Sequence, residues 1–205
     1  MLRKAGIDAA GELHLIIARG VKCRKDYLPQ KEFAAIAPHI EIMEISKATK
    51  EDIPGLCELL GYLFAQEAEF QPDRSLQSAG LQEIIDFPER GQILVLHEGT
   101  SLLGMISLLY TVSTALGGRV IILEDMVVHP DHRGSGAGSM LLQAAIDFAK
   151  SVACRRITLL TDQTNKSAQR FYKRYGFTIS RMVPMRLSFG EAGKGRSDGW
   201  ITYAI

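Results

Sequence analysis

The loop Arg133-Gly134-Ser135-Gly136-Ala137-Gly138 carries the most specific chemical signal in this chain of 205 residues. Its alternating glycines allow several backbone N–H groups to point into one concavity. An apolar run that predicts a strand precedes the loop, and a run with helical periodicity follows it. The free N–H groups and the dipole of such a helix favour an anion at its N-terminus. These residues therefore predict a binding site for a phosphate or a pyrophosphate.

The loop does not match two common nucleotide-binding motifs. A P-loop ends in Gly-Lys followed by Ser or Thr, whereas Gly138 is followed by Ser139 and Met140. A dinucleotide-binding G-x-G-x-x-G motif that starts at Gly134 would need a glycine where Ser139 stands. The alternative that remains open is a glycine-rich turn without a ligand.

The elements that would position this loop alternate along the chain from residue 41 onward. Thr49 and Asp52 form a capping-box pattern before the first helix, and Pro54 fits the first turn of that helix. The patterns predict strands at 42–45, 93–97, 102–112, 120–128 and 156–161, and helices at 53–64, 76–85, 136–150 and 167–175. An extended segment at 177–189, a polar loop and a last strand at 200–205 complete the prediction.

Composition excludes several classes of protein. Lys plus Arg is 24 and Asp plus Glu is 23, so no global field draws the chain to nucleic acid or to acidic membranes. Cys23, Cys57 and Cys154 are widely spaced, which indicates neither a metal site nor a disulfide framework and favours a reduced, cytoplasmic setting. We find no signal peptide and no apolar run long enough to span a membrane.

Two ordered motifs make the sequence recognisable. Arg133-x-x-Gly136-x-Gly138 follows Met126-Val127-Val128-His129-Pro130, and Asn165-x-x-Ala168-x-x-Phe171-Tyr172-x-x-x-Gly176-Phe177 comes after it at a suitable distance. Together they resemble the GNAT superfamily of N-acyltransferases over about residues 41–189. The resemblance implies an α/β (α+β) fold with a central mixed, mostly antiparallel sheet, flanked by about four helices and splayed between its fourth and fifth strands.

The resemblance also implies where acetyl-CoA binds, namely in the split of the sheet. The backbone of Met126 and Val128, with Val127 between them, would bind the pantetheine arm and the thioester carbonyl, and Asn165 would lie near the sulfur end. The pyrophosphate would be held by Arg133, Gly134, Ser135, Gly136, Ala137, Gly138 and Ser139. No metal is implied.

Two side chains are candidates for proton transfer. Tyr172 matches the family's usual general acid, which protonates the departing sulfur; the alternative is a tyrosine that only packs beside Phe171. Glu124 shares strand parity with Met126 and is our candidate base, acting through water, whereas Asp125 points the other way unless a bulge intervenes. A structural contact is the alternative for Glu124. The run at 123–128 is similar to that of glucosamine-6-phosphate N-acetyltransferases.

The resemblance predicts an enzyme that transfers the acetyl group of acetyl-CoA directly to a primary amine of a small molecule or a peptide, in a ternary complex. The alternative is a non-catalytic acyl-CoA-binding regulatory or sensor domain. Homodimers are common in this superfamily. Nucleic acid and membranes are not expected partners.

Residues 1–40 read as an extension before a domain at 41–205. The stretch from Arg3 to Asp26 resembles the opening strand of small HUH-type transposases, although the metal motif and nucleophilic tyrosine of that family are not recognisable downstream. The alternative is an unrelated N-terminal strand or arm.

Overall fold

The computed structural model describes residues 5–7, 13–15, 43–66 and 72–187. A short hairpin, β1 (Ala5–Ile7) and β2 (Leu13–Leu15), precedes the main body. The main body consists of β3 (Met43–Lys47), η2 (Lys50–Asp52), α2 (Ile53–Phe64), α3 (Arg74–Asp86), β4 (Gly91–Glu98), β5 (Ser101–Ser113), β6 (Gly118–Val128), η3 (Pro130–His132), α4 (Ala137–Ser151), β7 (Ile157–Leu159) and α5 (Lys166–Lys173).

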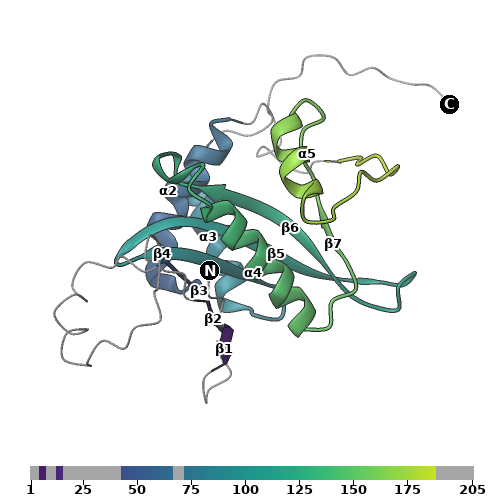
Figure 1. Ribbon diagram of the computed structural model, residues 1–205, viewed down its shortest axis with the longest axis horizontal. Coiled ribbons are helices and arrows are strands. Elements are labelled where there is room, and N and C mark those ends of the chain that lie inside the picture. The colour runs from purple at the N-terminus through teal and green to yellow at the C-terminus, as the bar shows by residue number, and fades with distance from the viewer. Residues whose placement is uncertain (1–4, 8–12, 16–42, 67–71, 188–205) are drawn as a thin grey trace, which may run out of the picture.

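The main sheet has five strands in the order β3-β4-β5-β6-β7 (Figure 1). Neighbouring strands are antiparallel from β3 to β6. Short turns join β4 to β5 and β5 to β6, where Gly99 and Gly117 have positive φ angles of 59° and 62°, whereas η2, α2 and α3 connect β3 to β4. β7 is parallel to β6, because α4 carries the chain back along the sheet before β7 begins. The mixed, mostly antiparallel sheet that the resemblance implied is confirmed.

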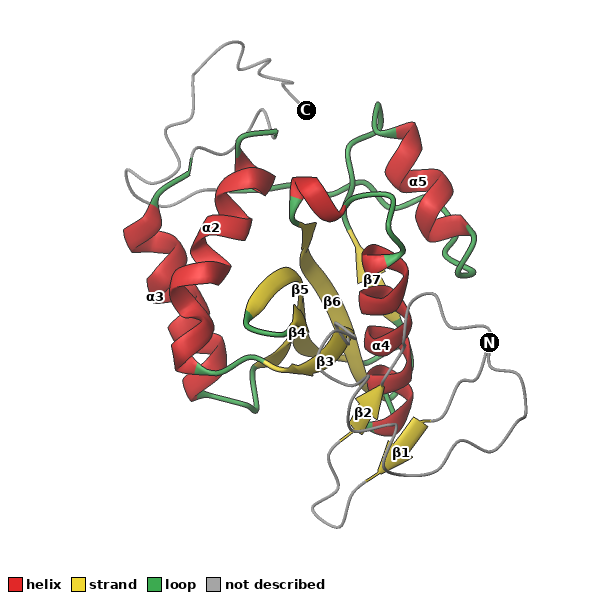
Figure 2. Cartoon of the chain, turned by 60° about the vertical axis from the view of Figure 1, so that its left-hand side comes forward, coloured by secondary structure: helices red, strands yellow, loops and turns green. Residues whose placement is uncertain are grey.

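Helices cover both faces of the sheet, with α4 on one face and α2 and α3 on the other (Figure 2). On the α4 side, Leu141, Leu142 and Ala145 pack on Ile106 and Ile121 of the sheet. The opposite core joins α2 and α3 to the other face of the sheet, and it comprises Leu56, Cys57, Leu59, Leu60, Leu81, Ile93, Val95, Met105 and Val127. The two cores fix the sheet from both sides and thereby hold β6 in place.

Local signals fix where the helices on the second face begin. The Thr49 backbone N–H donates to Asp52 Oδ2 at 2.7 Å, which confirms the capping box, and Pro54 lies in the first turn of α2. Asp73 caps α3 by accepting the backbone N–H groups of Ser75 and Leu76 at 2.9 and 3.1 Å. These caps satisfy donors that helix geometry leaves unpaired.

β6 is irregular next to the point where the sheet opens. Leu108 of β5 pairs with Leu123, but Ile106 pairs with Met126, so Glu124 and Asp125 together oppose Ser107. This is a β-bulge, and it reverses the face on which the following side chains lie. The ladder between β6 and β7 also ends at Leu123, so the part of β6 from the bulge onward has no strand beside it on that edge within the described chain. The predicted splay between the fourth and fifth strands is confirmed.

Several expected elements differ from the structure or lie outside the described residues. The strand expected at 156–161 is limited to Ile157–Leu159, and residues 177–187 form no strand, although we expected an extended element there. Within the segment from Arg3 to Asp26 that resembles a transposase strand, only the strands Ala5–Ile7 and Leu13–Leu15 are described. The polar loop at 190–199, the last strand at 200–205 and most of the segment that resembles a transposase strand lie outside the described residues.

Candidate functional site

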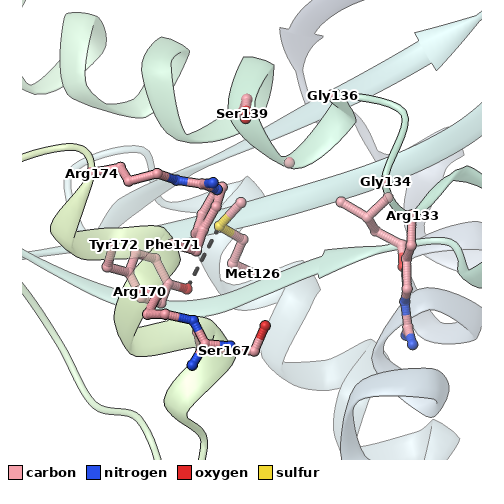
Figure 3. A pocket seen from close by; sticks show the side chains of 13 residues that line it. Met126, Arg133, Gly134, Gly136, Ser139, Ser167, Arg170, Phe171, Tyr172 and Arg174 are labelled. Atoms are coloured by element: carbon pink, nitrogen blue, oxygen red, sulfur yellow. Dashed lines mark hydrogen bonds between the residues drawn. The ribbon is translucent and has the colours of Figure 1, made fainter.

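A pocket of about 640 Å³ opens at the splay, between the end of β6, the first turn of α4 and one face of α5 (Figure 3). It is lined by Met126, Val128, Arg133, Gly134, Gly136, Gly138, Ser139, Ser167, Ala168, Arg170, Phe171, Tyr172 and Arg174. Eight of the predicted site residues are among these. The two sequence motifs, which are separate in the chain, thus meet at one cavity.

The glycine loop presents the N-terminus of α4 to this pocket. Gly134 and Gly136 have φ angles of +74° and +96°, a backbone conformation that residues other than glycine rarely adopt. A Cβ atom at either position would meet nothing within 4 Å. The first main-chain hydrogen bond across the start of α4 runs from the Met140 N–H to the Gly136 carbonyl. The N–H groups of Gly138 and Ser139 precede that bond, so they are available to an anion.

Gly138 is the point where three elements meet. A Cβ atom at this position would lie 3.6 Å from Met126 Cε, 3.7 Å from Val128 Cγ2 and 3.8 Å from Phe171 Cζ. These are ordinary van der Waals separations, so the start of α4, the end of β6 and α5 border the same narrow space. The Tyr175 hydroxyl, which donates to the Ser139 carbonyl at 3.4 Å, ties α5 to the first turn of α4.

The backbone of β6 also faces the pocket. His129 donates its N–H to Leu103 O of β5 at 2.8 Å, and successive residues of a strand direct their backbone groups to opposite neighbours. Val128 and Met126 therefore direct theirs away from β5, to the edge that β7 no longer covers. Arg133 Nε donates to the Val128 carbonyl at 3.2 Å, which holds the loop against the strand.

Tyr172 lies within the pocket with its hydroxyl at Met126. The hydroxyl donates to Met126 Sδ at 3.7 Å, and the ring packs edge-on against Phe171 and Phe177. Burial raises the pKa of Tyr172 to about 12, because the phenolate would lose its hydration. The phenol therefore keeps its proton at neutral pH. A thioether sulfur is a weak acceptor, so a better acceptor in the pocket could take this hydrogen bond.

Four of the predicted cofactor-binding residues do not line the pocket. Val127 is 4% exposed and packs in the core under α2, so only its backbone is near the site. Ala137, the first residue of α4, is buried in the core between that helix and the sheet, and Ser135 Oγ donates to the His132 carbonyl. Asn165 caps α5, because its Oδ1 accepts the Ala168 N–H at 3.0 Å. Ser135 and Asn165 therefore shape the site by fixing backbone next to it.

Glu124, the candidate base, is not among the lining residues. Its side chain is exposed, and the structure places it in the β6 bulge together with Asp125. The bulge matters because parity along a regular strand would have separated these two carboxyl groups. His129 precedes η3 and His132 ends it, and their rings pack edge-on with centroids 5.8 Å apart.

Sequence reasoning missed the basic face of α5. Ser167, Arg170 and Arg174 line the pocket, but none was predicted as a site residue. Arg170 and Arg174 are one helical turn apart, so they lie on one face of α5. Their spacing was the signal that would have found them, together with the lack of an acidic residue on this helix.

Among the described residues we find neither a metal-binding cluster nor a helix that could span a membrane. Within the described ranges, no cluster of three or more His, Cys, Asp or Glu side chains has an arrangement that would hold a metal ion. None of the helices described is both long enough and apolar enough to cross a membrane.

Comparisons with known proteins agree with this geometry. The sequence model of the acetyltransferase (GNAT) family matches residues 60–177. The chain is 28% identical over 138 residues to the uncharacterized N-acetyltransferase YhfO of Bacillus subtilis, covering 66% of this chain and 89% of that one. It is 31% identical over 140 residues to the glucosamine 6-phosphate N-acetyltransferase of Trypanosoma brucei brucei, covering 66% and 88% of the two chains.

A solved structure shows the same fold. The aminoglycoside N-acetyltransferase AAC(6')-Iy in complex with CoA aligns with a TM-score of 0.63 at 17% identity, covering 75% of this chain and 99% of that one. At this identity the likeness concerns the fold. Since the family model spans more than half of the sequence and the sheet, the splay and the glycine loop agree with it, the chain belongs to the acetyltransferase (GNAT) family and is an acyltransferase.

Proposed function

We propose that this enzyme transfers the acetyl group of acetyl-CoA directly to a primary amine of a small molecule or a peptide, within a ternary complex. The observation that carries the proposal is the position of the protonated Tyr172 hydroxyl in the same cavity as the free N–H groups at the start of α4. The N–H groups suit a phosphate group, and the Tyr172 hydroxyl suits a departing sulfur. The GNAT family uses acetyl-CoA, which contains both.

The residues of the pocket fit acetyl-CoA. The N–H groups of Gly138 and Ser139 and the guanidinium of Arg133 would hold the pyrophosphate, because an anion at this position meets both the helix dipole and a positive charge. The backbone of Met126 and Val128 would bind the pantetheine arm along the uncovered edge of β6. When bound, acetyl-CoA supplies an activated acyl group and a thiolate leaving group.

The chain then has three tasks in the transfer. Backbone N–H groups near the β6 bulge would donate to the carbonyl oxygen as negative charge develops on it, which is typically worth about 3 kcal/mol per donor. Tyr172 Oη would donate its proton to the sulfur as that atom departs. Glu124, through a water molecule, would accept the proton that the amine loses. The proton count balances, because one proton leaves the amine and one reaches the thiolate.

The acceptor site would lie beyond the bulge, on the side of β6 where α2 and α3 pack. The relative from Trypanosoma brucei brucei is named for an amino sugar phosphate, so glucosamine 6-phosphate is a reasonable first acceptor to test. Free amino acids and short peptides are the second class, because the proposal requires only a neutral primary amine that reaches the thioester carbonyl.

The test is a measurement of acetyl-CoA binding followed by a screen of primary amines for release of free CoA thiol. We expect micromolar binding, and turnover with at least one class of amine that falls at least 100-fold in Tyr172→Phe. Binding without turnover of any amine would support the sensor domain instead. A folded protein that binds no acetyl-CoA would contradict the proposal.

A further inference from the structure

The pocket carries more positive charge than a pyrophosphate needs. Arg133, Arg170 and Arg174 all line it, and no Asp or Glu is among its lining residues. Arg133 lies across the pocket from α5, at the glycine loop, where the N–H groups of α4 already provide for an anion (Figure 3). The two arginines of α5 are therefore additional to the site assigned to the pyrophosphate.

Arg170 and Arg174 lie one helical turn apart on the face of α5 that borders the pocket, where their like charges repel each other. Residues four apart on a helix are neighbours, and like charges in that arrangement destabilise the helix. None of the ion pairs found among the described residues involves either arginine. The Arg174 guanidinium lies over the Phe171 ring, with its carbon 5.6 Å from the ring centroid. An anionic ligand bound by both guanidinium groups would offset this repulsion.

The pair is placed next to the anion-binding end of α4. Phe171, which lies between the two arginines in sequence, borders Gly138 of that helix, and Tyr175, which follows Arg174, reaches Ser139. Figure 3 shows the Arg174 guanidinium near Phe171, beneath the first turn of α4, and the Arg170 guanidinium on the side of Ser167. A ligand whose diphosphate sits at the glycine loop could thus place a second phosphate between α4 and α5.

We infer that Arg170 and Arg174 form a separate subsite for the 3′-phosphate of the CoA ribose and make the enzyme select CoA over its dephospho form. This inference rests on the proposed function, because it assumes that the same pocket binds CoA. A phosphate monoester carries nearly two negative charges at neutral pH and presents three acceptor oxygens. Two planar guanidinium groups match that charge and can each bind it through two N–H groups. Ser167 is available as a further hydroxyl donor to the same group.

The alternative is that the two arginines strengthen pyrophosphate binding. The alternatives differ in one measurable respect, because dephospho-CoA retains the pyrophosphate and lacks only the 3′-phosphate. If the arginines serve the pyrophosphate, their loss weakens CoA and dephospho-CoA alike. If they serve the 3′-phosphate, their loss weakens CoA alone.

The experiment is calorimetric titration of CoA and dephospho-CoA into the 205-residue wild type, Arg170→Gln, Arg174→Gln, the double variant and Lys173→Gln. Lys173 is the matched control, because its change removes the same charge from the same helix at a residue that does not line the pocket. We expect wild type to prefer CoA roughly tenfold, as a charged hydrogen bond gained would give. The double variant should lose the preference, and Lys173→Gln should keep it. The preference should also shrink as salt screens these exposed groups.

Three outcomes would contradict the inference. The first is equal affinity of wild type for the two compounds, a result that does not depend on whether any variant folds. The second is equal weakening of both compounds in the arginine variants, which would assign these residues to the pyrophosphate. The third is a loss of the preference in Lys173→Gln as well. Absence of binding of either compound to folded wild type would instead overturn the proposed function, and the inference with it.

Discussion

Two alanine substitutions in the glycine loop should change thermal stability in opposite directions. Gly136 has a φ of +96° at the N-cap of α4, whereas Gly138 lies two residues on, inside the first turn. Gly136→Ala forces an L side chain into a left-handed backbone, which costs about 1–2 kcal/mol. Gly138→Ala keeps an allowed backbone and restricts the unfolded chain, which stabilises by about 0.4–1 kcal/mol.

The space around each added Cβ atom supports the predicted loss of stability in Gly136→Ala and the predicted gain in Gly138→Ala. A methyl group at Gly138 would rest 3.6–3.8 Å from Met126, Val128 and Phe171, which is contact without overlap. A methyl group at Gly136 would meet nothing within 4 Å, so no packing offsets its backbone strain. The free energies of unfolding of the two variants should therefore differ by about 2 kcal/mol. For a domain of this size that is a difference in Tm of about 4–8 °C.

The assay is thermal unfolding of the ligand-free variants, followed by circular dichroism, with reversibility checked by a second scan. Wild type should fall between the two variants, with Gly138→Ala above it and Gly136→Ala below it. Equal shifts of the two variants in the same direction would refute the assigned loop conformation. The glycine loop would then not hold the N–H groups of α4 as the structure shows.

The remaining predictions concern catalysis, titration and the core. Tyr172→Phe should lower kcat by about 100-fold or more with little change in acetyl-CoA affinity, and an unchanged kcat would remove Tyr172 as the acid. Because burial raises the pKa of Tyr172 to about 12, its contribution to stability is complete below about pH 10 and is lost as the pH rises through 12. Alkaline ultraviolet titration of wild type against Tyr172→Phe should show this late-ionising phenol, and ionisation of that phenol near pH 10 would contradict its burial. Glu124→Gln should lower kcat/KM about 100-fold whereas Asp125→Asn should not, and the reverse result would transfer the role of base to Asp125. Leu141→Ala should destabilise the fold by about 2–5 kcal/mol in urea denaturation, since Leu141 is fully buried between α4 and the sheet, and a loss below 1 kcal/mol would contradict its packing.

The sequence predicted the elements that local patterns determine. The capping box at Thr49 and the periodic apolar residues of α2 and α4 fix helices through contacts between near neighbours, so short-range rules suffice. The glycine loop was predictable for the same reason, because positive φ angles at Gly134 and Gly136 require glycine. The splay followed from the resemblance to a family and not from any residue pattern.

Features that depend on contacts between distant parts of the chain were harder to predict from the sequence. The bulge at Glu124 and Asp125 depends on how β6 pairs with Ser107 of β5, and no local signal in β6 sets that register. The burial of Val127 follows from the same reversal of faces, because the residues after the bulge change sides of the sheet. Arg170 and Arg174 were missed because their meaning depends on α5 lying against the start of α4.

The central claim is that the start of α4 binds the pyrophosphate of acetyl-CoA, and calorimetric titration of acetyl-CoA into wild type, Gly136→Glu and Gly117→Glu tests it most directly. Gly117 is the matched control, since it too has a positive φ and open space for a side chain, but it lies at the turn between β5 and β6, away from the lining residues. We predict micromolar binding to wild type and Gly117→Glu and none to folded Gly136→Glu, because the added carboxylate would repel the pyrophosphate. Undiminished binding to Gly136→Glu would contradict the claim.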